Sequence, residues 1–502
     1  MSLYLGIDFG TSTNVVTRWN ENTKRADVVP LGQYGTPNIF PNVIYYESPE
    51  KIFVGDYAVE KGKLNPENAV FYVKRKLESS DFRRHIPALG FDKTGVEVAA
   101  DIFSRIKREV EQKFGGEKID GAVISVPFAF QNAERSRIES AAKQAGLVVL
   151  GLIEEPVAAA ISFGLMDKVT FGKDEKILVF DLGGGTFDVT IFDFRKKSDL
   201  KFSIKVITTG GNKHLGGIDI DDAVIKKIRE MFDSQYSDYQ AETRARNLQE
   251  SEIFKIRQIA VELKESLSAD DDFDLILESA FDDRFFLEKN LERTDFDGWL
   301  KKFLVDIENV LTDTLRDADL KPNQIDRIVM VGGTSNIPAI KEKVRQYFGK
   351  EPEHYGDELT LMVGKGAGIY CGLKYVEKTL DCEISICTCR NIGIKFNGQF
   401  IEMLPKNTLY GTPSELKVLT IKNAGKNNVE IPLVEGNRVR NVKIGSINVS
   451  AEIQRQLDKG RLGLIINTDT SNGIVNYELH RVIEKNNNFV SEKILLKEKI
   501  GG

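Results

Sequence analysis

Two stretches of the chain, residues 3–16 and 177–190, repeat one pattern of apolar and polar positions. Each starts with an apolar run typical of a buried strand, and each run ends at an aspartate. A glycine turn, a threonine and a second β-prone run follow in both. Another pair of apolar runs, residues 119–127 and 325–333, leads into helical patterns. Because the two signals recur in the same order, the pattern predicts two related α/β lobes with a cleft between them.

Helical periodicity alternates with strands up to about residue 372, and short β-prone runs replace it afterwards. The predicted helices include residues 98–114, 133–146 and 337–348. Such alternation predicts mixed sheets flanked by helices. The later runs are residues 392–396, 416–421, 428–433, 440–444, 462–467 and 473–480. The turn pairs Asn397-Gly398, Glu435-Gly436 and Asn472-Gly473 separate them, which predicts an antiparallel β-sandwich.

Composition narrows the function classes. Of the 502 residues, 41% are hydrophobic and 29% charged, which excludes wholesale disorder. The net charge of −6 argues against a protein that grips phosphate backbones, so we expect no nucleic-acid partner. The four histidines lie far apart and the four cysteines lack CxxC spacing, so neither type predicts a metal site. With no secretory signal and no apolar run of about 20 residues, we expect a cytoplasmic protein outside the membrane.

The two glycine turns are candidates for binding phosphate. Successive backbone amides in such a turn form a nest for anionic oxygens, and glycine permits close approach. The turns consist of Gly10, Thr11, Ser12 and Thr13, and of Gly183, Gly184, Gly185 and Thr186. The preceding Asp8 and Asp181, and the strand residue Asp188, are candidates for Mg²⁺, which binds few carboxylates and keeps its waters. The alternative is that these aspartates only cap the turns.

Three further segments contain candidate functional residues, and an ordinary structural explanation is also open for them. Lys74 lies in a charge run that also fits a solvated face. Glu155 opens a small-residue helix, where an acidic residue favours the helix dipole. The turn Gly332-Gly333-Thr334 lies between a buried strand and a helix and could approach a nucleoside or phosphate. Neither a Walker A pattern nor a dinucleotide fingerprint occurs, which disfavours the P-loop and Rossmann classes.

Seven ordered motifs resemble the heat shock protein 70 family, the DnaK-type molecular chaperones: GIDFGTST, VKRKL, VISVPFAF, EEPVAAA, FDLGGGTFDVT, HLGGIDID and VGGTSNIP. The resemblance is strong over residues 3–372 and weaker over 380–485, where LPKNT, IPLVEGNRVRN and NTDTSNGIVNYEL occur. It implies an α/β, two-lobed actin-like ATPase of duplicated ribonuclease H-like lobes, followed by an all-β sandwich that binds substrate.

The resemblance also implies domain boundaries. The ATPase domain would span residues 1–375, with one lobe of about 1–176 plus 352–375 and the other of 177–351. An interdomain linker would cover residues 376–388. The peptide-binding sandwich would follow at 389–502.

Carried over residue by residue, the resemblance implies roles in ATP hydrolysis. Lys74 would orient the attacking water, Glu155 would help position water and metal, and Asp188 would hold a water or accept its proton. Asp8 and Asp181 would hold Mg²⁺ through its waters. The implied contacts to ATP or ADP are Gly10, Thr11, Ser12, Thr13, Gly183, Gly184, Gly185, Thr186, Gly216, Gly217, Lys264, Ser268, Gly332, Gly333 and Thr334, with Thr186 also placed in catalysis.

The chain departs from the family pattern at several of these places. Glu154 stands where the family usually has Asn, and Asn336 where an Arg normally stacks on adenine. Val261 stands where a Glu precedes the adenosine lysine. The linker segment DCEISIC keeps two apolar residues, Ile384 and Ile386, between polar ones.

Other features bear on the peptide domain. Pro127 and Arg135 resemble the pair through which the family relays nucleotide state to that domain. After the sandwich we expect no long helical lid of the kind that typical members have. Because a lid slows escape of the peptide, we expect weak binding with a high off-rate. Phe396 and Phe400 either line an apolar peptide groove or belong to the core of the sandwich.

The sequence therefore predicts an ATP-dependent chaperone-like ATPase with slow intrinsic turnover that binds unfolded or extended polypeptide. Expected partners include co-chaperones, namely a J-domain protein and a nucleotide exchange factor. Three alternatives stay open: a regulatory nucleotide sensor that binds one client with slow or no hydrolysis, an actin-like filament protein, and a small-molecule kinase on the same fold.

Overall fold

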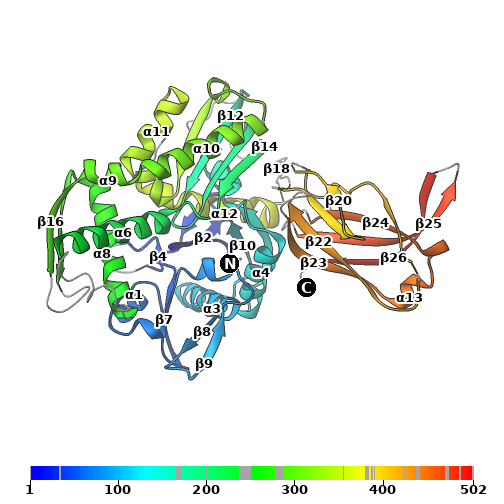
Figure 1. The fold of residues 1–502 in the computed structure, drawn as a ribbon, viewed down its shortest axis with the longest axis horizontal. Coiled ribbons are helices and arrows are strands. Elements are labelled where there is room, and N and C mark those ends of the chain that lie inside the picture. Colours follow the sequence, from blue (N-terminus) through cyan, green and yellow to red (C-terminus); the bar gives the residue numbers. More distant parts are fainter. Residues whose placement is uncertain are drawn as a thin grey trace.

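The computed structural model describes residues 2–32, 36–164, 172–198, 201–236, 250–278, 286–353, 356–378, 384–385, 388, 390–406, 408–422, 424–436, 441–469, 474–485 and 488–499. Figure 1 shows a two-lobed α/β body with a β-sandwich beside it. The N-terminal strand lies inside the α/β body, and the C-terminal strands lie in the sandwich.

The two lobes are built on sheets with one pairing pattern. In lobe I, β1 pairs in parallel with β10 and antiparallel with β2, which pairs antiparallel with β3. In lobe II, β12 pairs in the same way with β17 and β13, and β13 with β14. The strands are β1 (Tyr4–Phe9), β2 (Thr13–Asn20), β3 (Arg25–Val28), β10 (Gly121–Val126), β11 (Val149–Glu154), β12 (Asp174–Leu182), β13 (Phe187–Ser198), β14 (Lys201–Asn212) and β17 (Arg327–Val331). This correspondence confirms the duplicated lobes predicted from the sequence.

Helices cover the outer face of each sheet. α3 (Gly95–Lys113) and α4 (Asn132–Gln144) bury their apolar faces with β1 and β10 in lobe I. α6 (Gly217–Gln235), α10 (Lys301–Asp317) and α11 (Pro338–Phe348) do the same on β12 and β13 of lobe II. The helices predicted at 98–114, 133–146 and 337–348 are thus confirmed, with small shifts at their ends.

Each lobe carries an additional subdomain. In lobe I it contains β4 (Phe40–Pro41), β5 (Val43–Ser48), β6 (Lys51–Val54), α1 (Asp56–Leu64), β7 (Ala69–Phe71), α2 (Val73–Lys76), β8 (Arg83–Ile86) and β9 (Phe91–Thr94). In lobe II it contains α8 (Glu250–Ala269), β15 (Asp272–Glu278), β16 (Phe286–Glu292) and α9 (Arg293–Trp299). Short 3₁₀ turns occur at Pro66–Asn68, Pro322–Gln324, Gly333–Asn336, Gly356–Thr360 and Asp458–Gly460, and a π turn at Gly372–Val376.

Two helices of small residues, α5 (Glu155–Gly164) and α12 (Met362–Cys371), fill the space between the sheets. A Cβ atom on Gly366 would lie 1.8 Å from the carbonyl oxygen of Ala158, and one on Gly6 would lie 2.1 Å from the backbone nitrogen of Gly368. Glycine at these crossings therefore lets the helices pack backbone to backbone. The tight packing fixes the angle between the lobes at the base of the cleft.

The sandwich consists of two four-stranded sheets, ordered β20-β19-β22-β23 and β21-β24-β25-β26. Its strands are β19 (Ile392–Phe396), β20 (Gln399–Leu404), β21 (Lys417–Thr420), β22 (Val429–Gly436), β23 (Asn441–Val449), β24 (Arg461–Thr468), β25 (Val475–Lys485) and β26 (Asn488–Lys499), with a short helix α13 (Ala451–Gln454) between β23 and β24. All pairings are antiparallel, and alternate side chains of both sheets form one apolar core. The predicted sandwich is confirmed.

Several local predictions need correction. Asn397-Gly398 forms the expected tight turn, with positive φ at both residues, but Glu435-Gly436 ends β22 and is paired with β23. A carboxylate and a glycine suggested a turn, whereas burial against lobe I keeps the segment extended. Asn472-Gly473 lies outside the described residues. β20 and β26 were not predicted, because their alternation is interrupted by charged residues.

Two contacts lie near the expected lobe boundaries. β12 begins at Asp174, and the backbone of Glu353 bridges to Val329 of lobe II. Of the linker, the described residues Ile384–Ser385 form β18, which pairs in parallel with Ile204 and Lys205 at the edge of the lobe II sheet. Ile386 lies outside the described residues.

The sandwich docks mainly against lobe I. Asn132, at the start of α4, donates to Glu435 Oε1 at 3.0 Å and accepts from the backbone N–H of Val475 at 2.7 Å. The Tyr410 hydroxyl donates to Glu154 Oε1 at 3.0 Å. Within the described part of the chain, no helix combines the length and apolar character that a membrane span requires.

Candidate functional site in the cleft between the lobes

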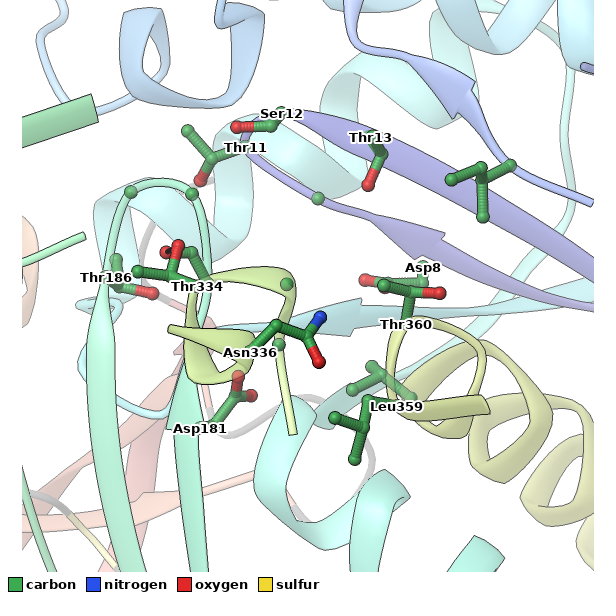
Figure 2. Close-up of a pocket in the computed structure, with 18 of the residues that line it drawn as sticks. Asp8, Thr11, Ser12, Thr13, Asp181, Thr186, Thr334, Asn336, Leu359 and Thr360 are labelled. Carbon is green, nitrogen blue, oxygen red and sulfur yellow. Dashed lines mark hydrogen bonds between the residues drawn. The ribbon is translucent and has the colours of Figure 1, made fainter. Parts of the chain in front are cut away.

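A cavity of about 460 Å³ opens between the lobes and is lined by both of them (Figure 2). Lobe I contributes the turn after β1, and lobe II contributes the turn after β12 and the last turns of α8. The predicted site residues that line it are Asp8, Gly10, Thr11, Ser12, Thr13, Lys74, Glu155, Asp181, Gly183, Gly184, Gly185, Thr186, Lys264, Ser268, Gly332, Gly333 and Thr334. Residues separated by more than 300 positions thus share one cavity.

The two glycine turns approach each other at one end of this cavity. A Cβ on Gly184 would lie 1.9 Å from Ser12 Oγ, and one on Gly185 would lie 2.6 Å from the side chain of Thr11. Any larger residue would push the lobes apart at this point. Thr334 Oγ1 donates to the carbonyl oxygen of Gly183 at 2.8 Å and so fixes the second turn. Both turns are therefore held in position by contacts that only these small residues permit.

The glycines of the HLGG motif lie directly behind the second turn and do not line the cavity. A Cβ on Gly216 would lie 2.6 Å from the backbone of Gly185. The N–H of Gly217 donates to the carbonyl oxygen of Gly183 at 3.0 Å. Through these contacts the two glycines hold the shape of the turn that contains Gly183 and Gly185.

Asp8, Glu155, Asp181 and Lys74 line the cavity together, and Asp188 lies behind them, opposite Asp181 in the strand ladder and outside the lining. Lys74 Nζ forms a buried ion pair with Glu155 Oε1. Burial, together with the nearby Glu155 carboxylate, raises the pKa of Asp8 and of Asp188 to about 7. Burial and the same carboxylate raise the pKa of Asp181 well above its usual range, and Asp188 and Asp8 add to the effect. The cluster thus concentrates negative charge that one ammonium group cannot offset.

The carboxylate oxygens fit a hydrated divalent cation. Asp181 Oδ2 and Asp188 Oδ2 are buried and have no hydrogen-bond partner among the described residues. Asp8 Oδ1 accepts from Ser125 Oγ at 2.6 Å. Across the described residues, no three acidic, histidine or cysteine side chains gather closely enough to ligate a metal directly. Carboxylates with unfilled lone pairs at such spacing suit Mg²⁺, which keeps most of its waters.

The other end of the cavity is lined by α8 and by residues that the sequence prediction missed. Lys264 Nζ pairs with Asp221 Oδ1 at 2.7 Å, and Ser268 Oγ donates to the backbone oxygen of Lys264 at 2.6 Å. The unpredicted lining residues are Ile39, Glu265, Ala269, Ile337, Leu359, Thr360 and Val363, and Asn336 joins them. Glu265 was detectable, because it lies one helical turn before Ser268. Leu359 and Thr360 had no local signal, because only the fold returns them to the cleft.

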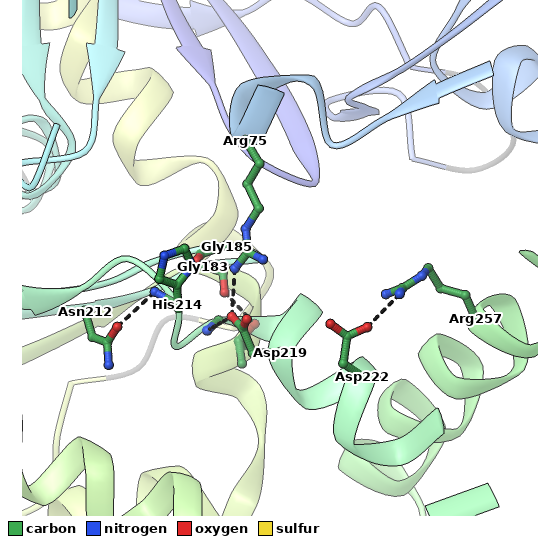
Figure 3. A network of polar contacts seen from close by, with 10 residues as sticks. Arg75, Gly183, Gly185, Asn212, His214, Asp219, Asp222 and Arg257 are labelled. Carbon is green, nitrogen blue, oxygen red and sulfur yellow. Dashed lines mark hydrogen bonds and ion pairs between the residues drawn. The ribbon is translucent and has the colours of Figure 1, made fainter. Parts of the chain in front are cut away.

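Polar contacts join the two lobes beside the second glycine turn (Figure 3). Arg75, on α2 of lobe I, donates to the carbonyl oxygen of Gly185 and to Asp219 Oδ2, both at 2.7 Å. Within lobe II, Arg257 of α8 pairs with Asp222 of α6 at 2.6 Å. The first pair of contacts spans the cleft and ties the second turn to lobe I.

A loop connects the acidic cluster to the docked sandwich. The backbone of Ala129 hydrogen-bonds to Asp188, and the neighbouring carbonyl oxygen of Phe130 accepts from Arg135 Nε at 3.1 Å. Arg135 Nη1 then pairs with Glu154 Oε1 at 2.8 Å, the same oxygen that accepts from Tyr410. Pro127 begins this loop, and its carbonyl oxygen accepts from the N–H of Phe130 at 3.1 Å.

The aromatic residues considered for a peptide groove have different surroundings. Phe396 packs, partly buried, against the apolar core of the sandwich. Phe400 lies over Gly393 of the neighbouring strand, where a Cβ would be 2.8 Å from its ring.

Comparison with known proteins places this architecture in a family. A sequence profile described as Hsp70 protein matches residues 4–459. The chaperone protein DnaK of Thermotoga petrophila is 32% identical over 457 residues, which cover 89% of this chain and 73% of that protein. The chaperone protein DnaK of Thermus thermophilus is 32% identical over 464 residues, covering 87% of this chain and 71% of that protein.

The fold and the cleft are those of a two-lobed actin-like ATPase followed by a β-sandwich. The chain belongs to the Hsp70 protein family, whose matched relatives are chaperone proteins.

Proposed function

We propose that this protein is an ATP-dependent chaperone that hydrolyses ATP with Mg²⁺ in the interlobe cleft and couples hydrolysis to binding of extended polypeptide by the sandwich. One observation carries the proposal: two glycine turns meet at a cavity that is also lined by a buried lysine and by the carboxylates of Asp8, Glu155 and Asp181. Family membership supports the same function. A J-domain protein and a nucleotide exchange factor are the co-chaperones we propose.

Each group at the base of the cleft has a chemical role in this proposal. Lys74, held by Glu155, would orient the attacking water and stabilise charge on the γ-phosphate. Asp188 would accept the proton of that water, because a carboxyl with a pKa of about 7 exchanges protons near neutral pH. Asp8 and Asp181 would hold Mg²⁺ through water. When bound, the ion offsets the charge of the phosphates.

The turn amides complete the site. Their N–H groups would bind phosphate oxygens without a basic side chain, while Thr11, Ser12, Thr13 and Thr186 would add hydroxyl donors. Arg75 holds the second turn through Gly185, so it would act as a positioning residue. Hydrolysis of ATP at this place yields ADP and phosphate.

Coupling to the sandwich would follow the loop from Asp188 through Arg135 to Glu154. A shift of the Ala129 backbone on hydrolysis would move the carbonyl group that holds Arg135. Because Arg135 and Tyr410 share one oxygen of Glu154, any such shift would change the contact with the sandwich. The parallel pairing of β18 with β14 offers a second connection, through the linker backbone.

ATP turnover by the full chain, measured with and without an excess of an unfolded apolar peptide, tests the proposal. We expect slow turnover that the peptide stimulates several-fold. Lys74→Ala should lower turnover about 10²–10³-fold, whereas Lys76→Ala, in the same charge run but outside the cavity, should not. Turnover that survives Lys74→Ala would contradict the assigned chemistry. Tight Mg-ATP binding without phosphate release would instead favour a nucleotide sensor.

Coupling is tested separately with Tyr410→Phe, which removes only the hydroxyl that donates to Glu154. Basal turnover should stay within about twofold of the parent, and stimulation by peptide should fall. The matched control is Tyr477→Phe, because the Tyr477 hydroxyl bonds to Glu498 inside the sandwich. Equal stimulation in parent and Tyr410→Phe would remove Glu154 from the coupling route.

A further inference from the structure

We propose that the cleft selects its nucleotide by the magnesium-bound phosphates and discriminates little between bases, so that guanosine and adenosine nucleotides both bind. This inference rests on the proposed function, because it concerns the ligand class of the same cavity. It follows from a difference between the two ends of that cavity.

The phosphate end is built from contacts that every nucleoside triphosphate can make. The turns present backbone amides and hydroxyl groups, and Lys74 stands at their base. In the proposed function these groups contact the phosphates, and two pairs of them, Gly184 with Ser12 and Gly185 with Thr11, meet directly between the lobes. Binding at this end therefore carries no information about the base.

The remaining wall carries a carboxylate where a base would lie. Glu265 of α8 lines the cavity one helical turn before Ser268 and is exposed to solvent. The face of a nucleobase, like that of an aromatic ring, attracts a cation and not an anion. A base beside this wall would thus meet apolar side chains such as Ile337 and Leu359 and an unfavourable charge.

The one basic side chain on this wall among the described residues is already engaged. Lys264 pairs with Asp221, which is buried, so its charge is locally offset. Asn336, an exposed amide in the turn Gly333–Asn336, also lines the cavity (Figure 2). No cation of the described part of the chain therefore stacks freely on a base in this cavity.

Hydrogen bonds to the base edge would not restore selectivity. The Ser268 hydroxyl already donates to the backbone of Lys264, which leaves its oxygen as an acceptor only. Asn336 offers one donor and one acceptor on a rotatable amide, so it can match the edge of adenine or of guanine. Strong discrimination requires buried groups that the wrong base leaves unpaired, and Asn336 is exposed.

Titration calorimetry on the full chain tests the inference, with Mg²⁺ and the β,γ-imido analogues of ATP and GTP. We expect the two dissociation constants to agree within about tenfold. Glu265→Arg should tighten both analogues three- to tenfold, because a guanidinium would stack on either base. The matched control is Glu262→Arg, which adds the same charge to the same helix outside the cavity and should change neither constant by more than about twofold.

The outcomes separate this inference from the proposed function. Preference for the ATP analogue by 100-fold or more would overturn the inference and leave the ATPase proposal standing. Equal effects of Glu265→Arg and Glu262→Arg would show that Glu265 does not face the base and would also overturn it. If neither analogue nor magnesium tripolyphosphate bound, the proposed function itself would fail, and the inference with it.

Discussion

Lobe I and lobe II have the same pattern of strand pairing, but the aspartates at the ends of their first strands have different neighbours. Asp8 and Asp181 occupy equivalent ends of β1 and β12. Across the antiparallel ladder Asp8 faces Val15, whereas Asp181 faces Asp188. Asp8 also accepts a hydrogen bond from Ser125, while Asp181 Oδ2 has no partner among the described residues.

This difference shows how a duplicated scaffold acquires asymmetric chemistry. The lobe I carboxylate is anchored by a hydroxyl and an apolar neighbour, so it suits a fixed structural or metal-holding role. In lobe II Asp181 faces a second carboxylate, Asp188, which adds to the rise in the pKa of Asp181. Burial and Glu155 raise the pKa of Asp8 in lobe I as well, so the valine or aspartate at this register position changes the charge beside the strand-end carboxylate in one lobe only.

The lobes differ on their outer sides as well. Lobe I offers the sandwich buried side chains, namely Asn132, Arg135 and Glu154. Lobe II offers the backbone edge of β14 to the linker and a surface ion pair, Lys406 with Asp317 at 2.6 Å. Buried polar contacts cost more to break than surface pairs, so lobe I should dominate the docking.

The largest expected effect concerns the residue that distinguishes the two ladders. Asp188→Asn should lower ATP turnover about 10²–10³-fold, because it removes the proposed proton acceptor and keeps the shape. Val15→Ala, at the equivalent position of lobe I, should leave turnover per folded molecule within a few-fold. Single-turnover phosphate release with saturating Mg-ATP measures both. A comparable loss of ATP turnover in both variants would mean that Val15 and Asp188 do not differ in their importance for the reaction.

A second expected effect concerns packing on the inner faces of the two sheets. Gly6→Val in lobe I should cost about 3 kcal/mol or more, because its Cβ would collide with the backbone of α12. Lobe II carries Val179 at the equivalent place, buried within the core between the sheets. Val179→Ala should cost about 2 kcal/mol by leaving a cavity. Chemical unfolding gives both values, and a tolerated Gly6→Val would refute the close approach of α12 to β1.

A smaller expected effect concerns the lobe I contact with the sandwich. Asn132→Ala should weaken docking by about 1–3 kcal/mol, because it leaves Glu435 and the N–H of Val475 without their partner. Hydrogen exchange at the Val475 amide should accelerate about tenfold or more, since about 1.4 kcal/mol is a factor of ten. Unchanged protection of that amide would place the sandwich elsewhere in solution.

The same contact should depend on pH. Burial raises the pKa of Glu435 in the docked state. The nearby Arg390 and Arg135 lower this pKa, Glu134 raises it, and the hydrogen bond from Asn132 lowers it, but burial has the largest effect. A raised pKa means that the docked state binds the proton more tightly, so docking is strongest below the undocked pKa and weakens as pH rises through the docked value. Glu435→Gln should remove this dependence and strengthen docking near pH 7 by about 1 kcal/mol. Hydrogen exchange at the Val475 amide, measured from acidic to neutral pH, follows this pH dependence of docking. An identical pH dependence in the parent and in Glu435→Gln would show that Glu435 is not its source.

The smallest expected effect concerns the lobe II surface pair. Lys406→Ala should change docking by less than about 1 kcal/mol, because both partners are solvated. The exchange assay used for Asn132→Ala gives a direct comparison. If Lys406→Ala accelerated exchange more than Asn132→Ala did, lobe II and not lobe I would hold the sandwich.

The sequence predicted the repeated strands, the glycine turns and most residues that line the cavity. These signals are local, because an apolar run that ends at an aspartate and a glycine turn carries its own geometry. The sequence did not predict Leu359 or Thr360 in the cavity, nor Ser125 beside Asp8. Nothing in their immediate neighbours distinguishes them from other core or turn residues.

The amino-acid sequence by itself determined that two similar lobes exist and where their glycine turns lie. Only the tertiary structure decided which carboxylates face each other, that Tyr410 reaches Glu154, and that Glu265 lines the cavity. The physical reason is distance along the chain: local pattern fixes strands and turns, whereas charge interactions depend on burial and on neighbours that only folding brings together.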